Sequence, residues 1–341
     1  MRLVLGLCAA ALVAGLAPAH TQIEVKYTHD WKWEGPSAPF LMARDKGYFA
    51  EEGIEITMDS GAGSRESIPR VASGAYDIGF GDVNSLIKFR DQNPDIPLMA
   101  VMMVYNRPPF AIIGRKSLGV ETPKDLEGRI LGAPAPDAAY AQWDAFTAAA
   151  GIDADAVTIE NVGFPVREPM LAREEVDAVA GFSFSSFINL KAAGVPEDDI
   201  SVILMSEHGL EMYSNVIMVN PAFAEEHPDA VAGFLRALNR AIFETFEDPA
   251  AAVAHVIAAN DVAREAVELE RLEMSIDQAF LGPELETMPF GGIDEARFER
   301  AIQQIAQTYD FQNTPPSAGD IFDASFLPPA EERMVGDALL Q

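Results

Sequence analysis

Cysteine is almost absent from this sequence. Its one cysteine, Cys8, lies within an apolar run at the N-terminus, and the rest of the 341 residues contain none. A small scaffold stapled by disulfides is therefore excluded, and a chain that is 49% apolar is long enough to be stabilised by a large core instead. None of the five histidines has a partner at metal-ligand spacing, so we expect no metal site and no cofactor.

Positive charge is also scarce. The chain has 24 lysines and arginines against 53 aspartates and glutamates, which gives a formal charge of −29 and a pI of about 4.4. Such a surface repels nucleic acid and anionic lipid, so neither is expected as a partner. We interpret the excess of carboxylates as a solvated surface that keeps the protein soluble.

Long apolar runs are missing except at the start of the chain. Arg2 precedes the run from Leu3 to Leu16, which is followed by Ala17-Pro18-Ala19. A short basic region, an apolar region of this length and an A-x-A site predict a signal peptide over 1–19, cleaved near Ala19. The alternative is an uncleaved anchor. Export without disulfides favours a periplasmic protein.

What the chain does contain is a regular alternation of strand and helix patterns. Strands are predicted over 23–29, 54–60, 76–80, 96–105, 110–117, 129–133, 156–162 and 213–220. Helical patterns separate most of them, which indicates an α/β fold with mostly parallel sheets and helices on both faces. From Pro228 onward the pattern is helical. Two crossovers without a linker predict lobe one from 22–110 plus 215–341, and lobe two from 111–214.

One unit of the sequence occurs twice. The stretch "RVASGAYDIGFGDVNSL" (70–86) is matched one hundred positions later by "MLAREEVDAVAGFSFSSF" (170–187), with Asp77 facing Asp177 and Asp82 facing Phe182. Each copy reads as a helix, a turn, a buried strand and a loop. We interpret the pair as two similar lobes that each end a strand at a common cleft.

Polar and aromatic residues cluster where the predicted strands end. In an open α/β sheet, ligands bind beyond the carboxyl ends of the strands, so these residues are candidates for a ligand site. Asp82 has an alternative role as the cap of the helix that follows. Trp31 and Trp33 point to opposite sides of an extended chain, so one of them is expected to face the cleft.

Motifs for catalysis are missing. "GAGSRE" (61–66) lacks the Gly-Lys-Ser/Thr ending of a phosphate loop, and "GFSFSSF" (181–187) is not a Gly-x-Ser-x-Gly nucleophile elbow. Carboxylates are too abundant for any one pair to indicate acid–base chemistry. We therefore predict a binding protein and not an enzyme.

Four segments in order, "RDKGYFAEEGIEI", "VASGAYDIGFGD", "TPKDLEGRILGA" and "REEVDAVAGF", resemble the periplasmic solute-binding proteins of ABC importers. The similarity is to the branch for nitrate, sulfonate, taurine and thiamine-pyrimidine precursors, the NMT1-like family. It implies a type II fold with two lobes, a hinge at 106–115 and 213–220, a monomeric protein, and delivery of a small molecule to a permease and ATPase at the inner membrane. The ligand contacts it implies are Trp31, Trp33, Ser37, Ser60, Asp82, Asn84, Tyr105, Asp137, Phe164, Phe182 and Phe184.

The class of ligand follows from charge. The loop "APAPDAA" (133–139) offers two prolines and Asp137 where an anion would need free N–H groups, whereas aromatics with Asp82, Glu34 and Asn84 suit a flat nitrogen heterocycle. We expect an aminopyrimidine-like compound, such as a thiamine precursor, or another small aromatic nitrogen compound. Sulfonate, taurine or nitrate is the alternative, and Arg65 supports it.

Two other classes of protein have the fold that this resemblance implies. One is an enzyme that makes the thiamine pyrimidine, although its cysteine-rich motif has no counterpart here. The other is a chemoreceptor-coupled binding protein.

Overall fold

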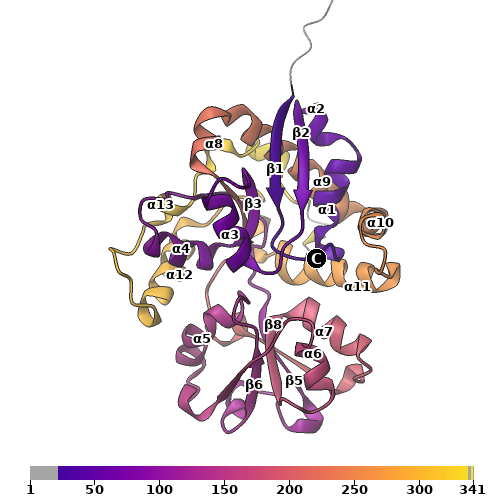
Figure 1. The fold of residues 1–341 in the computed structure, drawn as a ribbon, viewed down its shortest axis with the longest axis vertical. Helices are drawn as coiled ribbons and strands as arrows, with labels where there is room; N and C mark the ends of the chain where they lie inside the picture. Colours follow the sequence, from indigo (N-terminus) through magenta and orange to yellow (C-terminus); the bar gives the residue numbers. More distant parts are fainter. Residues whose placement is uncertain (1–21, 337–338, 341) are drawn as a thin grey trace, which may run out of the picture.

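The computed structural model describes residues 22–336 and 339–340, which form two α/β lobes, one above the other in Figure 1. The predicted signal peptide lies outside the described residues. Within the described part of the chain, no helix is both long and apolar enough to cross a bilayer.

The sheet of lobe one has five strands in the order β2-β1-β3-β10-β4. These are β1 (Ile23–Thr28), β2 (Ile54–Asp59), β3 (Ile78–Asp82), β4 (Met99–Met103) and β10 (Asn215–Val219). β1 runs parallel to β2 and β3, whereas β10 is antiparallel to β3 and β4. β3 and β10 are buried along their whole length, as their apolar sequences predict, and β2 alternates because it lies at the edge.

The sheet of lobe two repeats this plan with the order β7-β6-β8-β5-β9. Its strands are β5 (Phe110–Arg115), β6 (Ile130–Ala133), β7 (Thr158–Asn161), β8 (Ala178–Phe182) and β9 (Ile200–Leu204). Here β5 is the antiparallel strand, between β8 and β9. Each sheet thus receives its antiparallel strand directly after the chain has crossed from the other lobe.

Two short crossings form the hinge. The chain leaves β4 and enters β5 through residues 104–109, and it returns to β10 through residues 209–214. The two crossings lie side by side, since the amides of Val104 and Tyr105 both donate to the carbonyl of Asn215 at 2.9 Å. Phe110 already pairs with Phe182 in the second sheet, so the hinge is shorter than the predicted 106–115.

The helices around the sheets begin and end at expected signals. Lobe one carries α1 (Ala38–Asp45), α2 (Tyr48–Glu51), α3 (Ser64–Ala72) and α4 (Val83–Gln92), and lobe two carries α5 (Trp143–Ala150), α6 (Arg167–Ala172) and α7 (Ser183–Ala192). The break between α1 and α2 falls at Gly47, whose φ of 77° is left-handed. The residues from Ala38 to Glu51 therefore form two helices and not one.

The C-terminal segment is helical and returns to lobe one. It comprises α8 (Pro221–Glu226), α9 (Pro228–Glu247), α10 (Pro249–Ala259), α11 (Glu265–Ser275), α12 (Glu295–Thr308) and α13 (Ala318–Ile321). α8, α9 and α10 each begin with proline, which the first turn of a helix tolerates. α9 buries its apolar face on α1 and the sheet, with Phe234 stacked on Phe49 and Tyr27. Figure 1 shows α11 beside the boundary with lobe two.

Candidate ligand-binding site

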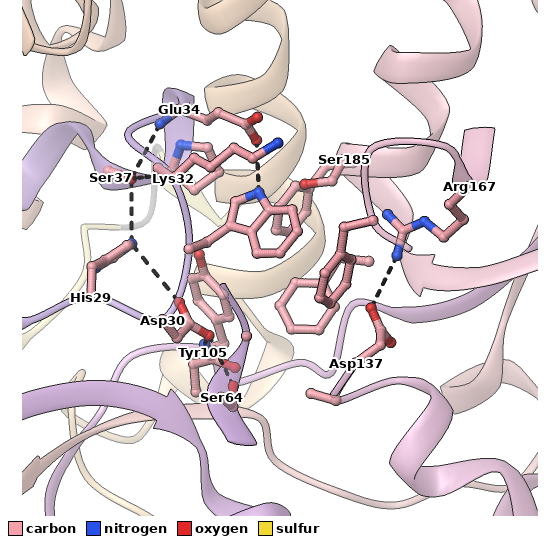
Figure 2. Close-up of a pocket in the computed structure, with 18 residues that line it drawn as sticks. His29, Asp30, Lys32, Glu34, Ser37, Ser64, Tyr105, Asp137, Arg167 and Ser185 are labelled. Carbon is pink, nitrogen blue, oxygen red and sulfur yellow. Dashed lines mark hydrogen bonds and ion pairs between the residues drawn. The ribbon is translucent and has the colours of Figure 1, made fainter. Parts of the chain in front are cut away.

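A cavity lies between the two lobes, where β1 of lobe one and β8 of lobe two end (Figure 2). Its empty space, counted with the solvent at its mouth, is about 570 Å³. Lobe one and the hinge contribute His29, Asp30, Trp31, Lys32, Glu34, Pro36, Ser37, Gly63, Ser64, Tyr105 and Asn215, and lobe two contributes Asp137, Ala138, Phe164, Arg167, Phe182, Phe184 and Ser185.

Aromatic rings from both lobes form the walls. The indole of Trp31 meets the ring of Phe164 edge-on across the boundary, with centroids 4.7 Å apart. Phe184 lies 5.8 Å from Phe182 and 6.2 Å from Tyr105, again edge to face. Rings arranged in this way present flat apolar faces, which suit a planar ligand.

Asp30 is the carboxylate on the lobe-one side, and it is only 5% exposed. Its Oδ2 accepts hydrogen bonds from Ser64 Oγ at 2.9 Å and from Asn215 Nδ2 at 2.7 Å. Among the described side chains, none donates a hydrogen bond to Oδ1, and the imidazole Nε2 of His29 lies 4.0 Å from it. Burial raises the pKa of Asp30 to about 7, with the two hydrogen bonds opposing it.

His29 stays neutral beside it. Burial lowers the pKa of its imidazole to about 3. Its ring nitrogens pair with the hydroxyls of Tyr27 at 2.8 Å and Ser37 at 3.3 Å, and the ring stacks on Phe80. His29 therefore gives Asp30 no positive charge, and Oδ1 remains an acceptor available to a ligand.

The lobe-two side carries a buried cation that is already paired. The guanidinium of Arg167, 2% exposed, donates to Asp137 Oδ2 at 3.0 Å, to Glu168 Oε1 at 2.8 Å and to the carbonyl of Ala180 at 3.1 Å. Burial lowers the pKa of Arg167, but the two carboxylates outweigh it and the net shift is upward. Burial raises the pKa of Asp137, whereas the positive charge of Arg167 lowers it. One cation between two carboxylates makes a poor receptor for an anion.

Residues 35–252, more than half of the chain, match the family model described as NMT1/THI5 like. The chain belongs to the NMT1/THI5-like family. This confirms the resemblance on which the sequence interpretation rests.

Three proteins that are similar to this chain are named for different functions. A riboflavin-binding protein of Chloroflexus aurantiacus is 26% identical over 62% of this chain and 59% of its own length. A formylaminopyrimidine-binding protein of Halalkalibacterium halodurans is 26% identical over 86% of this chain and 88% of its own. A 4-amino-5-hydroxymethyl-2-methylpyrimidine phosphate synthase of Aspergillus parasiticus is 24% identical over 67% of this chain and 68% of its own.

Solved structures confirm the predicted fold. The alkanesulfonate-binding protein SsuA of Xanthomonas axonopodis superposes with a TM-score of 0.68 at 13% identity, over 88% of this chain and 98% of that one. The two-lobe periplasmic binding protein fold is therefore shared.

Most of the residues predicted to contact a ligand line the cavity of this NMT1/THI5-like protein. They are Trp31, Ser37, Tyr105, Asp137, Phe164, Phe182 and Phe184. One of the two tryptophans faces the cleft, as expected, and it is Trp31. Trp33 packs toward the core against His29, with ring centroids 5.3 Å apart. Contact of the seven residues with a ligand stays a prediction.

Asp82 and Asn84 do not line the cavity, which corrects their predicted place. Asp82 is fully buried and caps α4: Oδ2 accepts from the amide and hydroxyl of Ser85, and Oδ1 from the amide and side chain of Asn84. Asn84 Nδ2 also donates to the carbonyl of Tyr213 at 2.8 Å. Both carboxylate oxygens are thus occupied by the start of the helix.

Ser60 and Arg65 are also placed elsewhere. Ser60 is exposed at the end of β2, and its carbonyl accepts from Arg70 at 3.3 Å. The side chain of Arg65 reaches across to lobe two and donates to the carbonyl of Ala135 at 2.8 Å. Arg65 joins the lobes outside the cavity, so it does not supply the anion contact for which it was considered.

Several lining residues were missed as ligand contacts. Asp30, Lys32 and Ser64 stand in loops identified as strand ends, and a geometric rule that ranked buried carboxylates would have found Asp30. The sequence carries a further signal for Arg167. At the separation of one hundred positions that relates the two copies of the repeat, Arg167 corresponds to Ser67, and a charged side chain in a buried unit needs a partner of opposite charge. Nothing in the sequence marks Asn215.

Metal binding has no support in the described residues, where no group of three or more His, Cys, Asp or Glu side chains could hold an ion.

Proposed function

We propose that this chain captures a small planar nitrogen heterocycle in the cavity between its lobes and delivers it to an ABC import complex. The observation that carries the proposal is Asp30 Oδ1, a buried carboxylate oxygen at a cavity walled by aromatic rings and left without a side-chain donor among the described residues. An amino group or a ring N–H of the ligand would donate to this oxygen.

The remaining chemistry of the cavity agrees with a neutral or cationic ring. Its flat faces would lie against Phe182, Phe184 and Trp31. An anion would have to approach Asp30 and Asp137 and compete with carboxylates for Arg167. Formylaminopyrimidine and riboflavin, which two relatives are named for binding, are both planar nitrogen heterocycles, and they support the proposal over sulfonate or nitrate.

Closing of the two lobes would accompany capture. Arg65 donates to Ala135, and Lys88 Nζ donates to the carbonyl of Ala141 at 2.7 Å, so each contact joins lobe one to lobe two. Contacts of this kind break when a hinge opens, and a ligand that touches both lobes shifts the population toward the closed form.

The direct experiment releases the resident compound. The protein is purified without ligand additions from a periplasmic extract, denatured, and the supernatant is analysed by mass spectrometry. Calorimetric titration of the refolded protein follows with formylaminopyrimidine, riboflavin, taurine and nitrate. We expect a planar nitrogen heterocycle to be released and to rebind. Release of a sulfonate, with tight binding of taurine and none of the heterocycles, would contradict the proposal.

An enzymatic role is the rival, because a pyrimidine phosphate synthase is among the relatives. The resemblance implies that such an enzyme makes the pyrimidine from its own active-site residues. The reaction would therefore change the mass of the intact chain. We propose binding without catalysis, and the mass of the intact chain is expected to stay constant while the heterocycle is bound and released. A permanent loss of mass on incubation would favour the enzyme.

A further inference from the structure

One buried arginine on α11 joins both lobes to the wall of the cavity. Arg271 is 3% exposed. Its Nη1 forms an ion pair with the carboxylate of Glu34, and its Nη2 donates to Asn189 Oδ1 at 3.2 Å. Glu34 belongs to lobe one, whereas Asn189 lies on α7 of lobe two. The guanidinium therefore spans the boundary that opens and closes.

Glu34 also contacts Trp31. The oxygen that meets Arg271, Oε2, also accepts the indole N–H of Trp31 at 3.1 Å (Figure 2). The indole faces Phe164 of lobe two and lines the cavity. An unbroken series of contacts thus runs from Asn189 through Arg271 and Glu34 to the aromatic wall.

A cation is required at this position. Glu268 lies on the other side of Arg271, with Oε2 3.5 Å from its Nε, and it accepts the amide of Gly35 at 2.7 Å. Burial raises the pKa of Glu268. The positive charge of Arg271 lowers that pKa, and the negative charge of Glu34 raises it further. Without the guanidinium, two carboxylates would face each other here, and the more exposed Glu34 would turn toward solvent and release the indole.

We propose that Arg271 is a positioning residue for ligand binding: it fixes the Trp31 wall through Glu34, and its bond to Asn189 ties this arrangement to the closed form. The inference rests on the proposed function. Arg271, Glu34 and Trp31 lie outside residues 35–252 that match the family model, whereas Asn189 lies within them.

The same pair of helices contains a matched control. Lys191 on α7 pairs with Glu270 on α11, and with Glu197 at 3.0 Å. It crosses the same boundary as Arg271, but neither of its partners touches Trp31. Lys191→Met therefore removes an ion pair between the lobes without removing the contact with Glu34.

The test observes the indole N–H groups directly. The chain has three tryptophans, so protein labelled with ¹⁵N at the indole gives three signals, which Trp→Phe variants assign. In the ligand-free protein, Arg271→Met and Glu34→Ala are expected to shift the Trp31 signal and to speed its exchange with solvent. Lys191→Met should leave that signal in place, and Arg271→Lys, which keeps a cation beside Glu34, should retain part of the wild-type protection.

Binding of formylaminopyrimidine supplies the second readout. Affinity should fall about tenfold in Arg271→Met and in Glu34→Ala, and no further in the double variant, because both changes break the same series of contacts. Asn189→Ala should weaken binding while leaving the Trp31 signal of the ligand-free protein unchanged.

An unaltered Trp31 signal in folded Arg271→Met, or losses of affinity that multiply in the double variant, would overturn the inference. If the wild-type chain binds neither formylaminopyrimidine nor riboflavin, the ligand class is wrong, but the shift of the Trp31 signal still decides whether Arg271 positions the wall.

Discussion

The turn from β3 into α4 and the turn from β8 into α7 are copies of one unit. Each strand has five residues and each helix ten, and the residues correspond at a separation of one hundred positions. Even the entry to the strands is the same: Asp77 Oδ2 accepts the amide of Lys26 and Asp177 Oδ2 accepts the amide of Ile130, both at 2.8 Å. Yet the residues at the strand ends, Asp82 and Phe182, differ in role.

The difference follows from what each side chain can do at a helix start. Asp82 accepts the first free amides of α4, so its carboxylate is directed at the backbone. Phe182 makes no such bond, and its ring is free to line the cavity. The carboxylate on the lobe-one side comes from the end of β1 instead, as Asp30.

A second pair of equivalent residues shows the same divergence. Ser67 Oγ donates to the carbonyl of Phe80 at 2.7 Å, and Arg167 Nη1 donates to the equivalent carbonyl of Ala180 at 3.1 Å. The longer side chain extends past that carbonyl to Asp137 and reaches the cavity. Equivalent backbones thus give lobe one a structural contact at Ser67 and lobe two, at Arg167, a side chain that lines the cavity.

The largest expected effect concerns the pH dependence of stability. A raised pKa means that folded Asp30 holds a proton which the unfolded chain has released between about pH 4 and pH 7, so the contribution of Asp30 to the free energy of unfolding falls as the pH rises through this window. The difference amounts to as much as about 4 kcal/mol. The lowered pKa of His29 acts in the opposite direction, and Asp30→Asn removes the contribution of Asp30 alone. Thermal unfolding at pH 4 and pH 7 should show a larger loss in wild-type protein than in Asp30→Asn. Parallel losses in the two proteins would refute the burial argument.

Alanine at the two equivalent strand ends should give opposite phenotypes. Asp82→Ala removes the cap of α4 and should lower the free energy of unfolding by about 1–2 kcal/mol. In protein that remains folded, the affinity for formylaminopyrimidine should change by less than about twofold, because Asp82 does not line the cavity. Phe182→Ala should weaken that binding about tenfold, since an aromatic contact is worth about 1 kcal/mol beyond its buried area. The pair is measured by urea unfolding and calorimetry, and an exchange of the two phenotypes would break the comparison.

The smallest expected effect is that two equivalent substitutions lower the free energy of unfolding by the same amount. Asp77→Ala and Asp177→Ala each remove one hydrogen bond from a carboxylate to a strand amide, and each should lower the free energy of unfolding by about 1 kcal/mol. The two values should agree within about 0.5 kcal/mol, because the sites are distant copies. Urea unfolding of each variant and of the double variant checks this, and a marked inequality would show that the two units are not energetically equivalent.

Much of the fold follows from local pattern. Buried strands, proline at helix starts and the repeated unit all depend on residues near one another in the chain, which is why the two-lobe architecture could be predicted. The candidate site was predictable as a set of strand ends, for the same reason.

Which strand-end residue faces the cavity could not be predicted. Asp82 ends β3 and Asp30 follows β1, so both are strand-end carboxylates, and only the position of the α4 amides shows that Asp82 is already bound. The roles of Asn215 and Arg271 depend on residues brought together by the hinge and by the return of α11 to the boundary, with no signal in the local sequence.

The most direct test of this account compares Asp30→Asn with Asp82→Asn, each titrated calorimetrically with formylaminopyrimidine above pH 7, where the carboxyl of Asp30 is mostly ionised. Asparagine caps helices well at position 82, and at position 30 it keeps an oxygen that can accept from Ser64 and Asn215, so both proteins should fold. A hydrogen bond to a charged group contributes about 1.5–3 kcal/mol, so Asp30→Asn should bind about ten- to a hundredfold more weakly than wild type, whereas Asp82→Asn should bind as wild type does. Weakened binding by Asp82→Asn with unchanged binding by Asp30→Asn would contradict the assignment of the two carboxylates.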